Sequence, residues 1–406
     1  MTTAPAVRFL DRTTPPHIVT LILLAGVSAL TMSIFLPSLS GMAVYFGVDY
    51  AVMQLAVSGY LATTAVLQVV IGPVSDRYGR RPVTLAALGI FIAATLGAML
   101  APTAAVFLFF RMFQGAVVTG IVLSRAIVRD MVPQEQAASK IGYVTMGMAL
   151  VPMVGPMIGG ALDQAFGWQA VFGFLALCGA GVLLLSLADQ GETLASGGMG
   201  FREQVRTWPE LLRSPRFWGY TICTAFASGA FFAFLGGASF VAQDIYGLNA
   251  FWTGVALGAP AVGYATGNFL SGRFSVAVGM NRMILLGVLA TTFGLGLSLL
   301  LTVTGLGNAW TFFLLVTFMG LGNGMTLPNA TAGLLGVRPH LAGTASGLGG
   351  AMMIGGGAAL SALAGAVLSV ESGSWPLQAI MLVSTLFSGV AIAYVIRRER
   401  QLGIPA

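Results

Sequence analysis

The sequence predicts an all-α polytopic membrane protein with twelve transmembrane helices in two six-helix bundles. Three observations support this fold class. The 406 residues are 57% hydrophobic and only 8% charged, whereas about a quarter of the residues of a soluble domain are charged. Twelve apolar runs of roughly 20 residues, enough to span a bilayer, follow one another. Features of the first six runs recur in the last six, which predicts that pseudo-twofold symmetry relates the two bundles.

The apolar runs divide the chain into three parts. The N-terminal bundle covers residues 1–190, and its spans are expected at about 18–40, 52–72, 82–101, 104–125, 140–162 and 168–188. A cytoplasmic linker covers residues 191–216, and its apolar residues at helical spacing predict either a helix on the bilayer surface or a solvated linker. The C-terminal bundle covers residues 217–406, with spans at about 217–241, 250–271, 282–303, 309–330, 342–367 and 375–396.

Matching residues and the distribution of charge define the repeat and its orientation. Trp168 recurs as Trp375 at an offset of 207 residues, and the segment 138–142 recurs at the same offset as 345–349. Every Lys and Arg except Arg111 lies in the termini, the linker or the loops on the same side of the membrane. The loops on the other side hold only acids, namely Asp49, Asp163, Asp244 and Glu371. This asymmetry predicts a multi-pass inner-membrane protein with both termini in the cytoplasm.

Composition excludes several classes of function. The net charge of +6 comes from short loops between apolar runs rather than from a basic module, which argues against nucleic-acid binding. Cys178 and Cys223 lie within or beside apolar runs and predict neither a disulfide nor a metal site. No catalytic constellation, metal cluster or phosphate-binding glycine loop is present, so we expect no cofactor, no enzyme and no ATP-driven pump.

The densest group of charged residues lies between the second and third spans. Two glycines border the charged side chains there, which predicts a tight loop at the membrane surface. The residues of this stretch that we expect to form a cytoplasmic gate motif are Gly72, Asp76, Arg77, Gly79, Arg80 and Arg81. Asp130 follows the fourth span and is an expected partner of Arg80 or Arg81. The alternative is a basic loop that sets topology and has no role in gating.

With two six-span halves and a central linker, this charged stretch resembles the signature of the major facilitator superfamily. Three further motifs are similar to those of its drug:proton antiporters, and in particular of the bicyclomycin- and chloramphenicol-efflux branch. They are Thr31-x-x-x-x-Leu36-Pro37, Arg111-x-x-Gln114-Gly115 and Gly155-Pro156-x-x-Gly159-Gly160. The resemblance implies export by alternating access, with Asp76 closing the cytoplasmic side against the N-terminus of the eleventh span. The second copy of the stretch, around 271–274, lacks the acid, so we expect a single latch.

Arg111 and Gln114 are the candidates for the cavity and for coupling. A charge at this depth is costly, so we expect Arg111 to face the cavity; the alternative is an arginine that snorkels outward or bonds to backbone carbonyls for packing. Ser33 stands where the efflux branch carries an acid in the first span, which leaves Asp163, at the outer end of the fifth span, as the nearest candidate for a titrating group. A cavity with arginine and no carboxylate favours neutral or weakly anionic compounds.

Two further sets of residues complete the expected site. Gly155 and Gly159 line one face of a helix that Pro156 bends, so this span can seal against the other half, with ordinary helix packing as the alternative. The pool of substrate-binding candidates, for each of which packing is the alternative role, is Thr31, Tyr60, Tyr143, Phe232, Tyr264, Asn268, Asn323 and Asn329.

The sequence therefore predicts a secondary transporter that exports small amphiphilic compounds across the lipid bilayer. The resemblance implies coupling to protons, and we expect the chain to act as a monomer. One alternative is an uncoupled or exchange-type metabolite exporter. Another is a non-transporting membrane receptor or assembly protein, which would be expected to carry a soluble domain or long loops.

Overall fold

The computed structural model describes residues 7–132, 144, 151, 154–194, 201–338 and 341–403. Ten of the described helices, several of them interrupted, are long and apolar enough to cross a membrane. The predictions that concern Tyr143, segment 138–142 and much of the fifth span lie outside the described residues. From residue 154 the fifth span is described, and it is helical as far as residue 166.

The first half consists of paired helices joined by short turns. The first span is α1 (Ile18–Ser33), a 3₁₀ turn at Leu36–Ser38 and α2 (Leu39–Phe46). The break occurs at Pro37, which has no N–H to continue the helix. The remaining elements are α3 (Tyr50–Met53), α4 (Leu55–Tyr78), α5 (Arg80–Met99), α6 (Ala104–Gln114), α7 (Thr119–Met131) and α9 (Trp168–Asp189).

The linker and the second half follow the same plan. In the linker, α10 (Phe201–Leu212) is helical, and its position relative to a bilayer stays a prediction. The second half contains α11 (Pro215–Phe240), α12 (Ala250–Leu257), α13 (Ala259–Val278), α14 (Met280–Val303), α15 (Ala309–Gly336), α16 (Ala342–Val367) and α17 (Trp375–Gln401). The predicted eighth span corresponds to α12 and α13, which contain Tyr264, Asn268 and Arg273 and are not among the ten apolar candidates.

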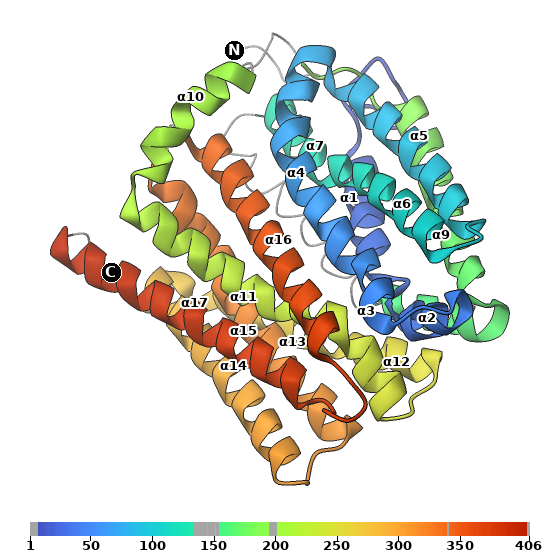
Figure 1. Cartoon of the computed structure of the whole chain (residues 1–406). Helices are drawn as coiled ribbons and strands as arrows, with labels where there is room; N and C mark the ends of the chain where they lie inside the picture. The colour runs from blue at the N-terminus through green and yellow to red at the C-terminus, as the bar shows by residue number, and fades with distance from the viewer. Residues whose placement is uncertain are drawn as a thin grey trace.

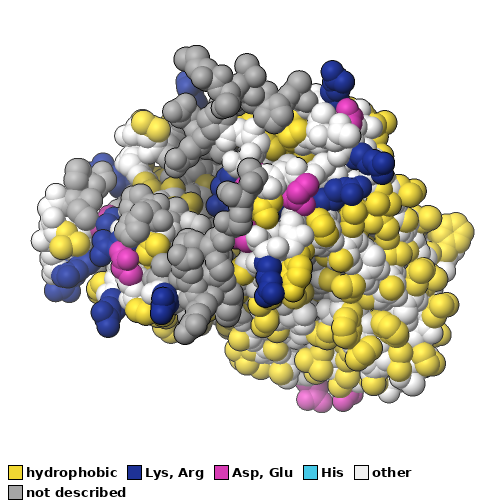
Figure 2. Space-filling model, turned by 90° about the horizontal axis from the view of Figure 1, so that it is seen from above, with side chains coloured by type: hydrophobic (Ala, Val, Ile, Leu, Met, Phe, Trp, Pro, Cys, Tyr) yellow, Lys and Arg dark blue, Asp and Glu magenta, His cyan; other side chains and the backbone are white. Residues whose placement is uncertain are grey.

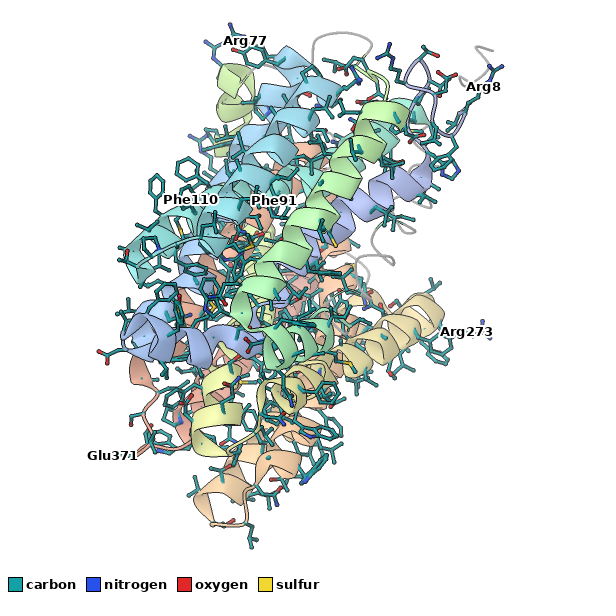
Figure 3. The ribbon with its side chains drawn as sticks, turned by 90° about the vertical axis from the view of Figure 1, so that its right-hand side faces the viewer. Arg8, Arg77, Phe91, Phe110, Arg273 and Glu371 are labelled. Carbon is teal, nitrogen blue, oxygen red and sulfur yellow. The ribbon has the colours of Figure 1, made fainter. Side chains whose placement is uncertain are left out.

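Figure 1 shows the two halves as separate bundles that meet where α4 and α16 lie side by side. A continuous buried apolar cluster joins them and contains Phe35 and Phe172 of the first half and Phe234 and Met381 of the second. Arg8 and Arg77 lie at one end of the molecule and Glu371 at the opposite end (Figure 3). We call these the basic end and the acidic end. Arginine side chains gather on the basic end, which faces the viewer in Figure 2.

Several helices continue past the predicted end of their span, among them α13 to Val278 and α15 to Gly336, and two of these errors concern the charged residues. The charged stretch is not a loop, because α4 remains helical to Tyr78 and α5 begins at Arg80. The chain reverses at Gly79 alone, whose φ of +96° favours glycine. The fourth span also continues past residue 125 to Met131, so that Arg125 and Asp130 belong to α7 rather than to a loop. Both helices extend by about two turns into the polar region, because carboxylate and arginine side chains there bond to one another.

The structure shows the repeat at the start of α5 and α14. Gly79 precedes α5 with φ +96°, and Gly279 precedes α14 with φ +94°. The position equivalent to Asp76 is Val276, which is almost fully exposed. The turn is thus common to both halves, whereas its acid is present only in the first.

Candidate functional site

Arg111 lies at the centre of the first half and is completely buried. Its Nε donates to the carbonyl of Ala56 at 3.0 Å, and one terminal nitrogen donates to the carbonyl of Thr31 at 2.9 Å. The other terminal nitrogen donates to Gln114 Oε1 at 2.6 Å. The Thr31 carbonyl belongs to the last turn of α1, where the helix itself supplies few donors. Arg111 therefore ties the first, second and fourth spans together.

Aromatic rings and a second amide complete this cluster. The guanidinium carbon lies 4.2 Å from the ring centroids of both Phe35 and Tyr60, a cation–π arrangement on two rings. Gln114 Nε2 donates to Thr95 Oγ1 at 2.9 Å, which adds the third span. The expected cavity-facing arginine is not seen, because the backbone carbonyls and rings of the first half enclose the side chain. The sequence alone could not predict these backbone carbonyls as partners of Arg111, since every residue has a carbonyl.

At the basic end, the charged stretch forms a compact network around Arg80. This side chain pairs with Asp76, and its Nε donates to Asp130 Oδ2 at 3.0 Å, as the sequence predicted for one of the two arginines. Ser75 accepts a further bond from Arg80. Arg77 is exposed and lies beside the ring of Tyr78, and a terminal nitrogen of Arg81 donates to the carbonyl of Leu187 at 3.3 Å.

Glu192 is a member of this network that sequence reasoning missed. Its carboxylate accepts from the backbone N–H of Arg80 at 2.9 Å and of Arg81 at 3.2 Å, and so caps the N-terminus of α5, where the helix dipole favours an anion. In the second half, Glu399 accepts from Arg216, from Tyr220 and from the side chain of Asn281 in the first turn of α14. Glu192 and Glu399 are 207 residues apart, the same offset that separates Trp168 from Trp375. This repeat offset could have identified Glu192 from the sequence.

The predicted latch between Asp76 and the eleventh span is not formed among the contacts of the described residues. Asp76 pairs instead with Arg80, within the first half. The first turn of α16 lies close to Arg129, whose terminal nitrogen is 3.6 Å from the position of a Cβ built on Gly343. Further along, α16 packs on α4, with Gly350 next to Gln68 and Gly355 next to Ala65.

The hydrogen bonds between described residues of the two halves all lie toward the acidic end. Tyr50 donates its hydroxyl to the carbonyl of Gly236 at 2.9 Å, and Gln54 Nε2 donates to the Ser361 carbonyl at 2.7 Å. From the second half, Ser239 donates to the carbonyl of Leu36, and Gln243 donates to that of Pro37. We call these four side chains, which are Tyr50, Gln54, Ser239 and Gln243, the acidic-end joint. Each of them donates to a backbone carbonyl of the opposite half.

The glycines of the export motif lie beside this joint. A Cβ at Gly160 would lie 2.3 Å from the carbonyl oxygen of Ala250, and one at Gly254 would lie 2.2 Å from that of Pro156. The fifth span and α12 therefore approach backbone to backbone across the interface between the halves. Gly159 faces the carbonyl of Ile34 within the first half. The small face of the bent helix thus contacts both its own half and the opposite one.

The other predicted residues occupy varied surroundings. Ser33 is buried, and a Cβ built on Gly155 would lie 3.1 Å from the serine oxygen, so the two residues pack against each other. Asp163 is half-buried. Thr31 donates its hydroxyl to its own helix, and Asn329 bonds to Ser271. The remaining members of the pool, half-buried or buried in the second half, are Phe232, Tyr264, Asn268 and Asn323. No cluster of His, Cys, Asp and Glu that could hold a metal ion occurs among the described residues.

Comparison with known proteins identifies the family. The family model of the Major Facilitator Superfamily matches residues 21–362. The chain belongs to the Major Facilitator Superfamily. Within the superfamily it is 30% identical over 355 residues to multidrug resistance protein D of Escherichia coli, which covers 84% of this chain and 87% of the relative. It is 34% identical over 215 residues to a chloramphenicol resistance protein of Pseudomonas aeruginosa, about half of each chain. These relatives confirm the predicted resemblance to the drug-efflux branch.

Comparison with solved structures supports the same architecture. A bacterial homolog of the human lysosomal transporter Spinster, in an inward-facing and unoccupied conformation, matches with a TM-score of 0.71. The match covers 94% of this chain and 96% of that one at 15% identity, and so shows the fold alone. The predicted fold class of a twelve-span facilitator is confirmed.

Proposed function

We propose that this member of the superfamily exports small amphiphilic compounds, neutral or weakly anionic, by alternating access. The names of its relatives, which are multidrug and chloramphenicol resistance proteins, support drug and antibiotic efflux. The positions of the basic residues support an inner-membrane orientation with the basic end and both termini in the cytoplasm. A single chain contains both halves, so we propose that the monomer is the transport unit.

The observation that carries this proposal is the chemistry of the acidic-end joint. Its bonds are neutral donors on backbone carbonyls, and no ion pair joins the two halves in the described part of the chain. A neutral hydrogen bond stabilises a structure by about 0.5–1.5 kcal/mol net. Four such side chains and a face of glycines can hold the acidic end closed and still separate in every cycle.

The basic end would close by a change of partner. In the proposed cycle, Asp76 exchanges its pairing with Arg80 for the N-terminus of α16, where the helix dipole favours an anion. Contacts of α16 with Gln68 and with Arg129 support this route, because they already hold the first half of α16 near α4 and α7. Val276 offers no equivalent acid, so the second half supplies no latch of its own.

We propose that export is coupled to protons through Asp163, and a second candidate function differs from the first in this coupling. The acids of the described residues lie toward the two ends of the molecule, and Ser33 is packed against Gly155. This observation favours a second candidate function, an uncoupled or exchange-type exporter. Asp163 lies at the outer end of the fifth span and is half-buried, which makes it the nearest candidate for a group that exchanges protons.

Reconstitution in liposomes tests both functions. A pH gradient is imposed, chloramphenicol is added as the probe, and drug movement and lumenal pH are recorded together. Export with proton movement that disappears in Asp163→Asn supports the coupled exporter. Drug movement without proton movement, equal in wild type and Asp163→Asn, supports the uncoupled exporter. Failure of wild-type protein to move chloramphenicol would contradict the proposed drug efflux.

A further inference from the structure

A cavity of about 280 Å³ lies at the acidic end, where the two halves meet. In the first half it is lined by α2 and the turn that follows it, and in the second half by the end of α11 and the next turn, Val241–Ile245. Here α2 packs against α11, and Figure 1 shows α2 and α3 at the same end of the molecule as α12. Because its walls belong to opposite halves, the cavity exists only while the acidic end is closed.

Two carboxylates from opposite halves line this cavity. Asp49 directly precedes α3, and Asp244 lies in the turn after α11. Both side chains are exposed, and neither forms an ion pair with another described residue. The loops on this side of the predicted membrane contain no Lys or Arg. Two like charges in one cavity, without a counter-ion, focus a negative potential that attracts a cation.

A buried hydroxyl in the same cavity lacks a partner. Ser40, on α2, is only 6% exposed, and its Oγ has no hydrogen-bond partner in the part of the chain that the structure describes. The usual acceptor for a serine in a helix is the carbonyl four residues earlier. For Ser40 this is the carbonyl of Leu36, which accepts instead from Ser239 of the opposite half. A buried hydroxyl without a partner destabilises a fold, so its presence calls for a partner that a bound molecule can supply.

The remaining walls suit an organic cation better than a bare metal ion. The ring centroids of Tyr50 and Phe240 lie 5.0 Å apart, and Val44 adds an apolar surface. An ammonium group with apolar substituents is attracted by an aromatic face as well as by carboxylates. The volume is close to the lower limit of about 300 Å³ for small-molecule sites, whereas one water fills about 30 Å³. A bare ion would therefore leave most of the cavity to solvent.

We propose that this cavity binds a small organic cation, an ammonium compound that also carries a hydroxyl or carbonyl group. Asp49 and Asp244 hold the positive charge, and Ser40 bonds to the polar group. The cavity divides when the halves separate, so the bound cation stabilises the form that is closed at the acidic end. The site is thus a regulatory one on the outer face, and it does not depend on which compound the protein exports.

Three small probes test the assignment by calorimetry on the purified full-length protein. Choline carries the charge and a hydroxyl, tetramethylammonium carries the charge alone, and 3,3-dimethylbutan-1-ol has the shape of choline without its charge. Choline should bind, and the neutral alcohol should bind at least about tenfold more weakly. Asp49→Asn and Asp244→Asn should each weaken choline binding by about fivefold, the upper value for an exposed ion pair, and the double variant by about 25-fold.

Ser40→Ala separates the role of the hydroxyl from that of the charges. This change should weaken choline binding by about fivefold, the size of one hydrogen bond, and leave tetramethylammonium binding unchanged. The melting temperature of the ligand-free variant should be equal to that of the wild type or higher, because the change removes a buried hydroxyl without a partner.

Glu371→Gln is the matched control, because Glu371 is an exposed acid of the same end that does not line the cavity. A loss of choline binding in Glu371→Gln equal to that in Asp244→Asn would overturn the assignment, as would equal affinities for choline and the neutral alcohol. Binding of calcium without binding of choline would overturn the class of ligand, and so would binding of neither ammonium compound. These measurements involve no transport, so a failure of the proposed export function would leave their result unaffected.

Discussion

A methyl group added at Gly254 should push the two halves apart at the acidic end. Gly254 lies on α12, and a Cβ there would approach the carbonyl oxygen of Pro156 to 2.2 Å. The obstacle is backbone on both sides, so no flexible side chain can move out of the way. The conflict exists only while the acidic end is closed, because Pro156 and Gly254 belong to opposite halves. Gly254→Ala therefore penalises the closed arrangement and leaves each half intact.

The size of the effect follows from known costs of overpacking. An extra methyl group in a tightly packed contact costs about 1–3 kcal/mol. Since 1.4 kcal/mol corresponds to about tenfold, the ratio of closed to open forms should fall by roughly fivefold to 150-fold. A population that begins near 99:1 would then move to about 10:1 for a tenfold change. Each helix should remain folded, because alanine favours a helix by about 1 kcal/mol over glycine.

Distances between spin labels measure this shift. Cysteines at Val44 and Val370, both exposed toward the acidic end on opposite halves, carry the labels after Cys178 and Cys223 are replaced by alanine. We expect Gly254→Ala to gain a population at longer distance. Gly41→Ala is the control, since a Cβ at Gly41 meets no atom within 4 Å. A distance distribution for Gly254→Ala that matches the wild type would refute the reasoning.

Three further predictions concern single side chains. Asp76→Asn should fold with normal yield but export chloramphenicol at least about tenfold more slowly, because an amide does not supply the charge that the latch needs; a normal rate in well-expressed protein would contradict this. Arg111→Met should lower the free energy of unfolding by roughly 3 kcal/mol, because the carbonyls of Thr31 and Ala56 and the side chain of Gln114 lose their donor; an unchanged denaturant midpoint would count against it. In the proton-coupled form of the proposed function, Asp163→Asn should abolish the proton movement that accompanies chloramphenicol export, because the amide cannot bind and release the proton; an unchanged lumenal pH signal in this variant would contradict coupling through Asp163.

The helices could be predicted from the sequence because apolar run length is a local property. The described spans match the predicted ones within a few residues at their apolar ends. Errors arose where polar segments stay helical, at Tyr78 and at Met131. There the side chains of Asp76, Arg80 and Asp130 satisfy one another, so polarity does not end the helix.

The site was predictable where its partners are side chains with complementary charge. The pairing of Arg80 with Asp130 could be predicted for this reason. The partners of Arg111 could not, because they are two backbone carbonyls and two rings that only the fold brings together. Glu192 was missed because its function is to cap a helix that begins 112 residues earlier. Its repeat partner Glu399 shows that the offset of 207 residues should have been applied to every acid.

The two ends of the molecule differ in how they respond to ionic strength. The contacts around Arg80 are ion pairs with partly exposed partners, and dissolved salt screens such pairs over about 8–10 Å under physiological conditions. The acidic-end joint consists of neutral donors and carbonyls, on which salt has little effect. Added salt therefore weakens the pairing of Asp76 with Arg80 and spares the acidic-end joint. In the proposed cycle, in which Asp76 leaves Arg80 for the N-terminus of α16, the balance between the two open forms then depends on the salt concentration on the basic side.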